Sequence, residues 1–551
     1  MKSNDPSNGA WRWLRGPILV LSLASAPFAA KAVYVPQFLA NDGIDLNDAN
    51  AKFSYSRSVE TDNWIIFWEP GFGKDPSTAS GTYKVDMNAL KAVVEKSYTM
   101  YLDSLKMVVK GSSLTDKYKM EVFLLYQTDW AAYGSGQDEK IGTLHVDPAA
   151  ANIATVVAHE IGHCFEYMTG ADVPGAGWRW GFKSDGSTGN GFWEQMAQWQ
   201  AFKTYPDQEF TNTDYPEYLT SNHKHIIHET PRYANYFIGD FWAYRHGIDF
   251  MGKLWRATKS PEDPVQTYMR MNSITIEQFN DEMYDHASRL TTWDLPAIKA
   301  RGANYITRRP QVKMSLTSDK YWLVDPSVAP ENTGYNSIKL NAPAAQTTIS
   351  VTFQGKAGAS GFRSLNSDKA GWRYGFVALL KDGTRVYSEM AAAKYANGAN
   401  PSGSLNFTVP ANCDKLWLIV TGAPQTYWAH VWDDNDANDE QWPYQVQLAN
   451  TNLLGETNPP AVVIPPTTGI RDGANAEDRS YQVRNGILEL VGGGQSAEIF
   501  DLQGRSVGAI GLGRKSIALG DLPKGILTVR VKSPGSETDR TTSFANLPQN
   551  H

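Results

Sequence analysis

The sequence predicts a multidomain protein: an α+β domain, then an all-β sandwich, then a small all-β module near the C-terminus. Its 551 residues exceed what one hydrophobic core usually organises. Apolar residues recur at helical spacing through much of residues 33–303, whereas residues 304–450 contain short strand-like runs separated by Gly, Asn, Pro and Asp. A proline-containing linker, residues 451–479, then precedes a second strand-rich stretch, residues 480–546.

Residues 1–32 have the pattern of an export signal. Arg12 and Arg15 precede an apolar run over residues 17–28, and Ala30-Lys31-Ala32 provides small residues around a cleavage point before Val33. The apolar run is shorter than the roughly 20 residues that a membrane-spanning helix needs. We therefore expect a secreted or cell-surface protein with no transmembrane span.

Charge and cysteine content exclude two further classes of protein. A formal net charge of −7 gives no electrostatic case for nucleic acid or an anionic membrane as a partner. The chain has 2 cysteines, Cys164 and Cys413, which are too few for a disulfide framework. We expect Cys164 to be a small buried residue, leave a bridge to Cys413 open, and expect a monomer.

The α+β domain contains the motif His159-Glu160-Ile161-Gly162-His163, inside an amphipathic helix expected over residues 152–168. Histidines four residues apart lie on one face of a helix, so His159 and His163 can bind one metal ion. Glu160 can reach a water molecule on that metal and act as general base. Two histidines are rare on the apolar face of a buried helix, because each needs a hydrogen-bond partner there. The motif therefore predicts a zinc site.

The same domain has further predicted elements on both sides of this motif. Strands are expected at residues 63–68, 121–126 and 143–146, with a long helix at 87–108. Later helices are expected at residues 192–202, 231–246, 249–257 and 276–288.

The order of strand, helix, strands and histidine helix resembles the N-terminal part of zinc-dependent peptidases of the zincin type. In that superfamily, the last strand before the helix is an edge strand that lines the cleft and pairs with an extended peptide substrate. The resemblance implies this role for residues 143–146, and edge pairing suits it because such pairing reads backbone groups. His145 in this strand either touches substrate or has no role.

A third metal ligand is expected, because a catalytic zinc usually takes three protein ligands and keeps one position for water. The metzincin pattern would place Gly and His three and six residues after His163. Glu166 and Thr169 stand there instead, which excludes that pattern. Several nearby polar residues remain alternative third ligands: Glu166, His223, His225, His228 and, more loosely, Asp172.

The segment Phe192–Phe202 is amphipathic, with Glu194 in its first turn and Ala197 three residues on. It resembles the Glu-x-x-Ala segment from which gluzincin-type peptidases take their third ligand. A small residue one turn on lets two helices approach closely, as converging ligands require. The resemblance therefore implies zinc bound by His159, His163 and Glu194.

Peptidases of this kind also need a donor to the oxyanion that forms when water attacks the carbonyl, commonly Tyr or His. A helix is expected from Pro231 to His246, with Thr230 as its N-cap. Tyr233, Tyr236 and His246 on this helix are the candidates. An aromatic helical stripe is more often core than catalytic, so the choice among them stays open.

Two features of the predicted sandwich suggest ligands. Its tryptophans can either stack on sugar rings or form the core, and we favour the core; they are Trp372, Trp417, Trp428, Trp432 and Trp442. The run Asp433–Glu440 can bind Ca²⁺ through oxygen ligands, but it lacks the Gly and final Glu of an EF-hand loop. A solvated acidic turn is therefore the favoured interpretation.

The C-terminal module contains Ala497–Arg505, with the turn Asp501-Leu502-Gln503-Gly504-Arg505, followed by Leu522–Val531. These residues resemble the C-terminal sorting domains of type IX secretion. The resemblance implies passage across an outer membrane, then release or surface attachment. A plain appended β-module is the alternative.

The chain as a whole resembles secreted bacterial gluzincin-type metallopeptidases. The resemblance implies a zinc-dependent peptidase that acts on a protein or peptide, with Glu160 as general base. A surface glycan-binding or adhesion protein with a structural or inactive metal site is the alternative, its glycan bound by the sandwich. Metal-dependent hydrolysis of a non-peptide amide is a third option.

Overall fold

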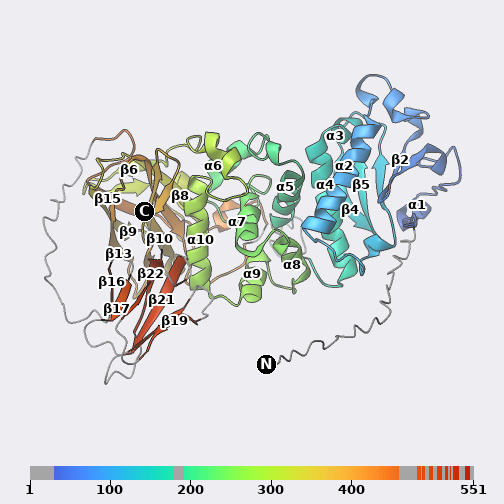
Figure 1. Cartoon of the computed structure of the whole chain (residues 1–551). Helices are drawn as coiled ribbons and strands as arrows, with labels where there is room; N and C mark the ends of the chain where they lie inside the picture. The colour runs from blue at the N-terminus through green and yellow to red at the C-terminus, as the bar shows by residue number, and fades with distance from the viewer. Residues whose placement is uncertain are drawn as a thin grey trace, which may run out of the picture. The chain divides into compact units, whose positions relative to one another are not determined.

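The structure is a computed structural model that contains a mixed sheet with helices, then a run of helices, then several β-sheets (Figure 1). It describes residues 30–177, 191–430 and 432–457 and, beyond them, the segments 481–484, 487–490, 496–500, 506–511, 516–518, 522, 525–532 and 540–546. Residues 1–29 of the expected export signal (residues 1–32) and residues 458–479 of the expected linker (residues 451–479) lie outside the described residues. The chain divides into two compact units, Met1–Ile464 and Pro465–His551. Among the described strands there is no closed barrel.

The first unit begins with a mixed five-stranded sheet in the order β1-β2-β3-β5-β4. Strands β2, β3 and β5 run parallel, whereas β1 and β4 pair antiparallel with their neighbours. The strands are β1 (Ser58–Glu60), β2 (Trp64–Trp68), β3 (Met120–Leu124), β4 (Ala132–Gln137) and β5 (Ile141–Val146).

The edge strand of this sheet is β4, so the expectation that residues 143–146 form the edge is wrong. Strand β5 lies between β3 and β4. The sequence of β4, Ala-Tyr-Gly-Ser-Gly-Gln, is polar and rich in glycine, and it lacks the apolar alternation by which strands are recognised. Its position in the sheet therefore depends on pairing with β5, and that pairing cannot be recognised in the local sequence.

The two faces of the sheet are covered by different parts of the chain. Helices α2 (Met87–Thr99) and α4 (Ala154–Asp172) pack on one face; α2 continues as a π-helical turn over Met100–Ser104, so the expected helix ends before Val108. The N-terminal segment covers the other face with Leu39, Leu46 and Phe53, which pack against Ile65, Phe67 and Phe123. Residues 39–53 therefore belong to the core of this unit.

A layer of helices follows the sheet. Its members are α5 (Phe192–Thr204), α6 (Tyr215–Ser221), α7 (Phe237–His246), α8 (Phe250–Arg256), α9 (Pro264–Asn272) and α10 (Ile276–Thr291). Helices α5, α7, α8 and α10 correspond to predicted helices, whereas α6 and α9 were not predicted. Helix α7 begins at Phe237, six residues later than expected. The backbone N–H groups of Ala234 and Asn235 both donate to Pro231 O, and the Asn235 side chain donates to Ile226 O. These bonds hold residues 231–236 as turns.

Two antiparallel five-stranded sheets follow, and their inner faces share one core that includes Phe353, Tyr374, Phe376 and Val446. One sheet contains β8 (Tyr335–Leu340), β10 (Gly371–Leu380), β11 (Arg385–Tyr387), β12 (Ala391–Lys394) and β14 (Cys413–Gly422). The other contains β6 (Met314–Leu316), β7 (Trp322–Val324), β9 (Thr348–Gly355), β13 (Ser402–Thr408) and β15 (Tyr444–Ala449).

The sheet with β10 and β14 is buried on both faces. Its outer face contributes Val377, Trp417 and Ile419 to the same hydrophobic cluster as the helices, next to α10. The helical and β parts of residues 30–457 therefore share a core. Trp372, Trp417 and Trp442 are at most 3% exposed and belong to these cores, as expected for most of the sandwich tryptophans.

The described part of the second unit is all-β. One small sheet contains β16 (Tyr481–Arg484), β17 (Ile487–Leu490) and β20 (Ser516–Ala518); the other contains β18 (Ser496–Phe500), β19 (Ser506–Ile510), β21 (Gly525–Lys532) and β22 (Arg540–Asn546). The turn Asp501–Arg505, on which the sorting-domain resemblance depends, lies outside the described residues. A search of the described helices finds none with the length and apolar character to cross a membrane.

Candidate metal centre

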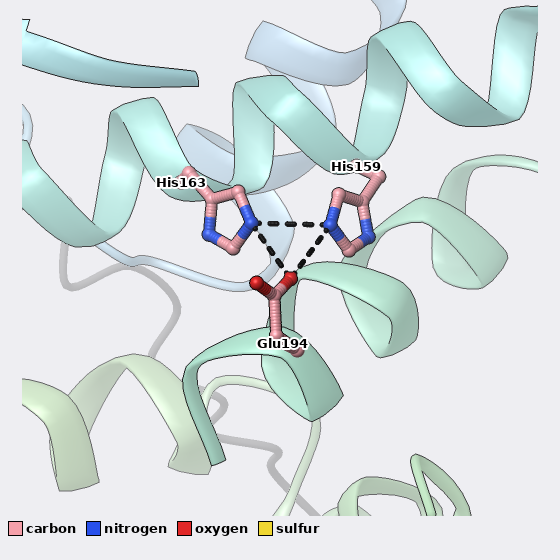
Figure 2. A group of neighbouring side chains, drawn as sticks. All are labelled: His159, His163 and Glu194. Atoms are coloured by element: carbon pink, nitrogen blue, oxygen red, sulfur yellow. Dashed lines mark hydrogen bonds and ion pairs between the residues drawn. The ribbon is translucent and has the colours of Figure 1, made fainter. Parts of the chain in front are cut away.

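Three ligand atoms converge between helices α4 and α5. His159 Nε2, His163 Nε2 and Glu194 Oε2 lie 3.1 Å from one another along all three edges of a triangle (Figure 2). A tetrahedral zinc with bonds of 2.0–2.1 Å keeps its ligand atoms about 3.3 Å apart. The side chains fit one face of such a tetrahedron, and they are 6–15% exposed.

Small residues let the two helices come close enough for these side chains to meet. A Cβ on Gly162 would lie 3.0 Å from Ala197 Cα and 3.2 Å from Ala197 Cβ. Gly162 lies between the two histidines, and Ala197 is one turn beyond Glu194. The small residue of the Glu-x-x-Ala segment therefore faces the motif helix at its closest approach.

The second nitrogen of each imidazole has an oxygen partner. His159 Nδ1 lies 3.1 Å from Gln198 Oε1, and His163 Nδ1 lies 2.9 Å from Glu166 Oε2. Gln200 Nε2 in turn donates to Glu166 Oε1 at 3.2 Å. Donation from Nδ1–H to these oxygens leaves both Nε2 lone pairs directed at the centre. Glu166, an alternative ligand on sequence grounds, thus orients His163.

The glutamines of this arrangement were absent from the sequence prediction. Gln198 follows Glu194 by four residues and so lies on the same helical face. That spacing is the one local signal that could have found it. Gln200 reaches the centre only through Glu166, a contact between two helices that spacing does not report.

The charge of the centre depends on Glu194. Burial raises the pKa of its carboxyl, but hydrogen bonds with His159 and His163 outweigh burial and hold the pKa well below its usual range. Glu194 is therefore an ionised oxygen donor. Together with two neutral imidazoles it forms the mixed donor set that suits zinc.

The predicted general base lies beside the edge strand. Glu160 Oε2 accepts a hydrogen bond from the backbone N–H of Gly134 in β4 at 2.6 Å. A Cβ on Gly134 would lie 1.9 Å from Glu160 O, and one on Gly136 would lie 1.9 Å from the Tyr167 ring. Only glycine at these positions lets β4 pass so close to α4.

The structure brings Tyr233 to the centre but neither Tyr236 nor His246. The rings of Tyr233 and His159 are 5.9 Å apart, and Tyr233 is 37% exposed. Burial and the charge of Glu194 raise the pKa of Tyr233 to about 12, so its phenol remains a hydrogen-bond donor.

The assignment of Tyr236 as a catalytic candidate is therefore corrected. Its ring is fully buried, and its hydroxyl donates to Glu209 O and accepts from Asn212 Nδ2. His246 Nε2 pairs with Tyr268 Oη at 2.8 Å. The physical reason is the late start of α7, which leaves Tyr233 on an exposed turn and Tyr236 at the buried beginning of the helix.

The other sequence candidates lie elsewhere. Asp172 accepts from Leu114 N, and His145 stacks on Phe123 at 4.9 Å, where burial lowers its pKa to about 4. Both cysteines are free, and Cys164 is buried.

The histidine run 223–228 contacts the acidic run Asp433–Glu440. Asp436 pairs with Lys224 at 3.0 Å, Asp439 with His228 at 3.2 Å, and Glu440 accepts from Asn332 N. These protein donors occupy carboxylates on which a Ca²⁺ site here would depend.

Comparisons with known proteins say little about activity. No curated protein matches the chain. A solved structure described as "Biofilm associated protein - BSP domain" matches at 13% identity over 43% of this chain, with a TM-score of 0.12. The chain spans about half, 51%, of the length of that structure. A family profile matches residues 25–455, and the chain belongs to that family, described as "Family of unknown function (DUF6055)".

Proposed function

We propose that this protein is a secreted zinc-dependent peptidase whose first α+β part is zincin-like and of gluzincin type. The observation that carries the proposal is the triangle of His159, His163 and Glu194, with ligand atoms 3.1 Å apart. Glu160 and the edge strand β4 beside it add the general base and a surface for an extended substrate.

Each residue has a distinct task in the proposed reaction. When bound, zinc supplies a Lewis acid that polarises the scissile carbonyl and acidifies water. Glu160 takes the proton from the attacking water and delivers it to the leaving amine. The N–H of Gly134 fixes the orientation of the Glu160 carboxylate. Tyr233 donates from its hydroxyl to the carbonyl oxygen as that oxygen gains charge.

The substrate class follows from the exposed edge. Among the described strands β4 pairs only with β5, so its other side has backbone groups to offer, apart from the Gly134 N–H that is bonded to Glu160. An extended polypeptide satisfies those groups, which favours a protein or peptide substrate over a small amide. The export signal and the sorting-like module in the sequence support action outside the cell or on its surface.

Cleavage of a casein-type substrate by the purified mature chain tests the proposal. Activity should be abolished by a chelator and restored by zinc. A chain that binds zinc and cleaves no protein substrate under any tested condition would favour the adhesion alternative. Glycan-array binding by the same preparation then tests that alternative directly.

A further inference from the structure

A loop of the β-sheet part reaches the segment that carries Tyr233. This β14–β15 loop, described over residues 423–430 and 432–443, follows β14 and ends at β15. Side chains of the loop contact residues 224–232, which lead directly into Tyr233. The pairs are His430 with Glu229, Trp432 with Arg232, Asp436 with Lys224, and Asp439 with His228.

His430 is the buried centre of this contact. Its Nε2 lies 2.7 Å from Glu229 Oε2, and its Nδ1 lies 3.5 Å from Asp439 Oδ1. The side chain of His430 is 8% exposed, and that of Glu229 is 1% exposed. Carboxylates at both ring nitrogens stabilise the doubly protonated imidazolium. We call His430, Glu229 and Asp439 the His430 clasp.

A metal ion is an alternative occupant of this cluster, because ligand atoms of His228, His430 and Asp439 lie within 4.8 Å of one another. The hydrogen bonds argue against it. Thr230 N–H donates to His228 Nδ1 at 2.9 Å, which uses the lone pair of that nitrogen, and His228 Nε2 lies 3.2 Å from Asp439 Oδ2. The Lys224 ammonium lies 3.1 Å from the same Nε2. A cation therefore already stands where His228 and Asp439 would coordinate a metal ion.

The clasp is connected to the metal centre through Arg232. Arg232 Nη1 donates to Glu229 O at 2.6 Å. Its guanidinium lies 5.2 Å from the centre of the Tyr233 ring and 5.0 Å from that of Trp432. Tyr233 in turn lies beside His159. The cation therefore stands against aromatic rings of both chain segments, which fixes the position of the Tyr233 turn.

We propose that His430 is a positioning residue that holds Tyr233 at the metal centre, so that the β14–β15 loop forms part of the active site. The inference rests on the proposed function in one respect: it assumes that Tyr233 donates to the reacting carbonyl. It changes the role of the β part from a separate binding module to a support for catalysis.

Charged and titratable groups surround the clasp on every packed segment. They are Lys224, His225, His228, Asp263, Glu331, Arg363, Asp436 and Glu440. Burial opposes the charge of His430, but hydrogen bonding to Glu229 and the charge of Asp439 raise its pKa to about 9. A raised histidine pKa stabilises the fold fully below the unfolded value near 6.5, and this contribution is lost as pH rises through about 9. The clasp should thus open in alkaline solution.

A double-mutant cycle on the mature full chain tests the inference. Tyr233→Phe should lower kcat by roughly 10²-fold, the usual order for loss of an oxyanion donor. His430→Gln should lower kcat by at least about 10-fold with little change in KM or zinc content, because it displaces a catalytic group without removing a ligand. The double variant should be no slower than Tyr233→Phe alone. His246→Gln, a histidine bonded to Tyr268 away from the centre, is the control.

Independent effects of the two substitutions would overturn the inference, as would loss of zinc from His430→Gln. A second metal ion per chain that His430→Gln releases would assign the cluster to metal binding instead. Hydrogen exchange of residues 224–236 provides a readout that needs no activity. At pH 7 exchange should be faster in His430→Gln than in wild type, and above pH 9 the two should converge once intrinsic rates are corrected. If neither wild type nor any variant cleaves substrate but exchange behaves in this way, the proposed function is wrong. The role of His430 in holding residues 224–236 is then still supported.

Discussion

The backbone N–H of Gly134 donates to Glu160 Oε2 at 2.6 Å, which joins the edge strand of the first sheet to the motif helix. The contact requires close approach, since a Cβ on Gly134 would lie 1.9 Å from Glu160 O. The backbone of the proposed substrate-binding strand thus also orients the proposed general base. A change in this strand should affect catalysis without a change in the metal ligands.

Gly134→Ala should displace β4 from α4 and lower kcat/KM by at least 10-fold, since a misplacement of about 1 Å costs up to about 10²-fold. Overpacking should also cost about 1–3 kcal/mol of unfolding free energy. Zinc content should remain that of wild type. Gly511→Ala, whose Cβ would meet nothing within 4 Å, is the matched control. Wild-type kinetics in Gly134→Ala would show that the position of β4 does not affect catalysis.

Glu160→Gln should retain zinc and lose activity by about 10²–10⁴-fold, the usual contribution of general acid–base catalysis. The amide oxygen of glutamine can still accept from Gly134 N–H, so the fold should be unchanged. Steady-state cleavage and metal content measured on one preparation check both statements. Glu139→Gln, an exposed glutamate near the end of β4, should match wild type in both. Cleavage by Glu160→Gln at the wild-type rate would refute the mechanism.

Glu166→Gln should weaken zinc binding by about 10–100-fold, as removal of an outer-shell carboxylate usually does. The buried carboxylate accepts from both His163 Nδ1 and Gln200 Nε2, and an amide in its place cannot accept equally well on both sides. Competition with a chromophoric chelator measures the affinity. Equal affinities of Glu166→Gln and wild type would show that His163 needs no carboxylate partner.

The His430 clasp also predicts how stability depends on pH. Between pH 6 and 7 wild type should resist urea better than His430→Gln, because the folded state holds the His430 imidazolium between Glu229 and Asp439 and so raises its pKa to about 9. The difference in unfolding free energy should shrink as pH rises through 9. Unfolding should be followed with zinc saturating in both proteins. A difference that persists unchanged to pH 10 would mean that charge on His430 does not stabilise the fold.

Local spacing predicted which three side chains converge at the candidate metal centre, but it did not predict the residues around them. His159 and His163 are four residues apart on one helix, and Glu194 has its small residue, Ala197, one turn on. Both spacings lie within a single helix, so they can be recognised in the sequence without knowledge of the fold. The edge strand has no such signal, because Gly134 and Gly136 are present for contact with α4 rather than for strand propensity.

Tertiary contacts explain the remaining differences. Helical spacing continues through residues 231–236, but contact between Asn235 and Ile226 holds them as turns, so Tyr233 and Tyr236 face different surroundings. Strands β10 and β14 contain long apolar runs, which are typical of strands buried on both faces. These runs do not reveal that α10 covers the second face. The pair of His430 and Glu229 joins residues 201 positions apart, which no sequence period reports.

Metal content and ligand identity test the central claim most directly. Mass spectrometry of metal in the zinc-saturated, dialysed chain should find one zinc per chain in wild type and in Glu139→Gln, and none in Glu194→Ala. X-ray absorption of the wild-type protein should report two imidazole nitrogens and at least one oxygen around that zinc. Zinc bound as tightly by Glu194→Ala as by wild type, or a wild type that retains no metal, would contradict the account.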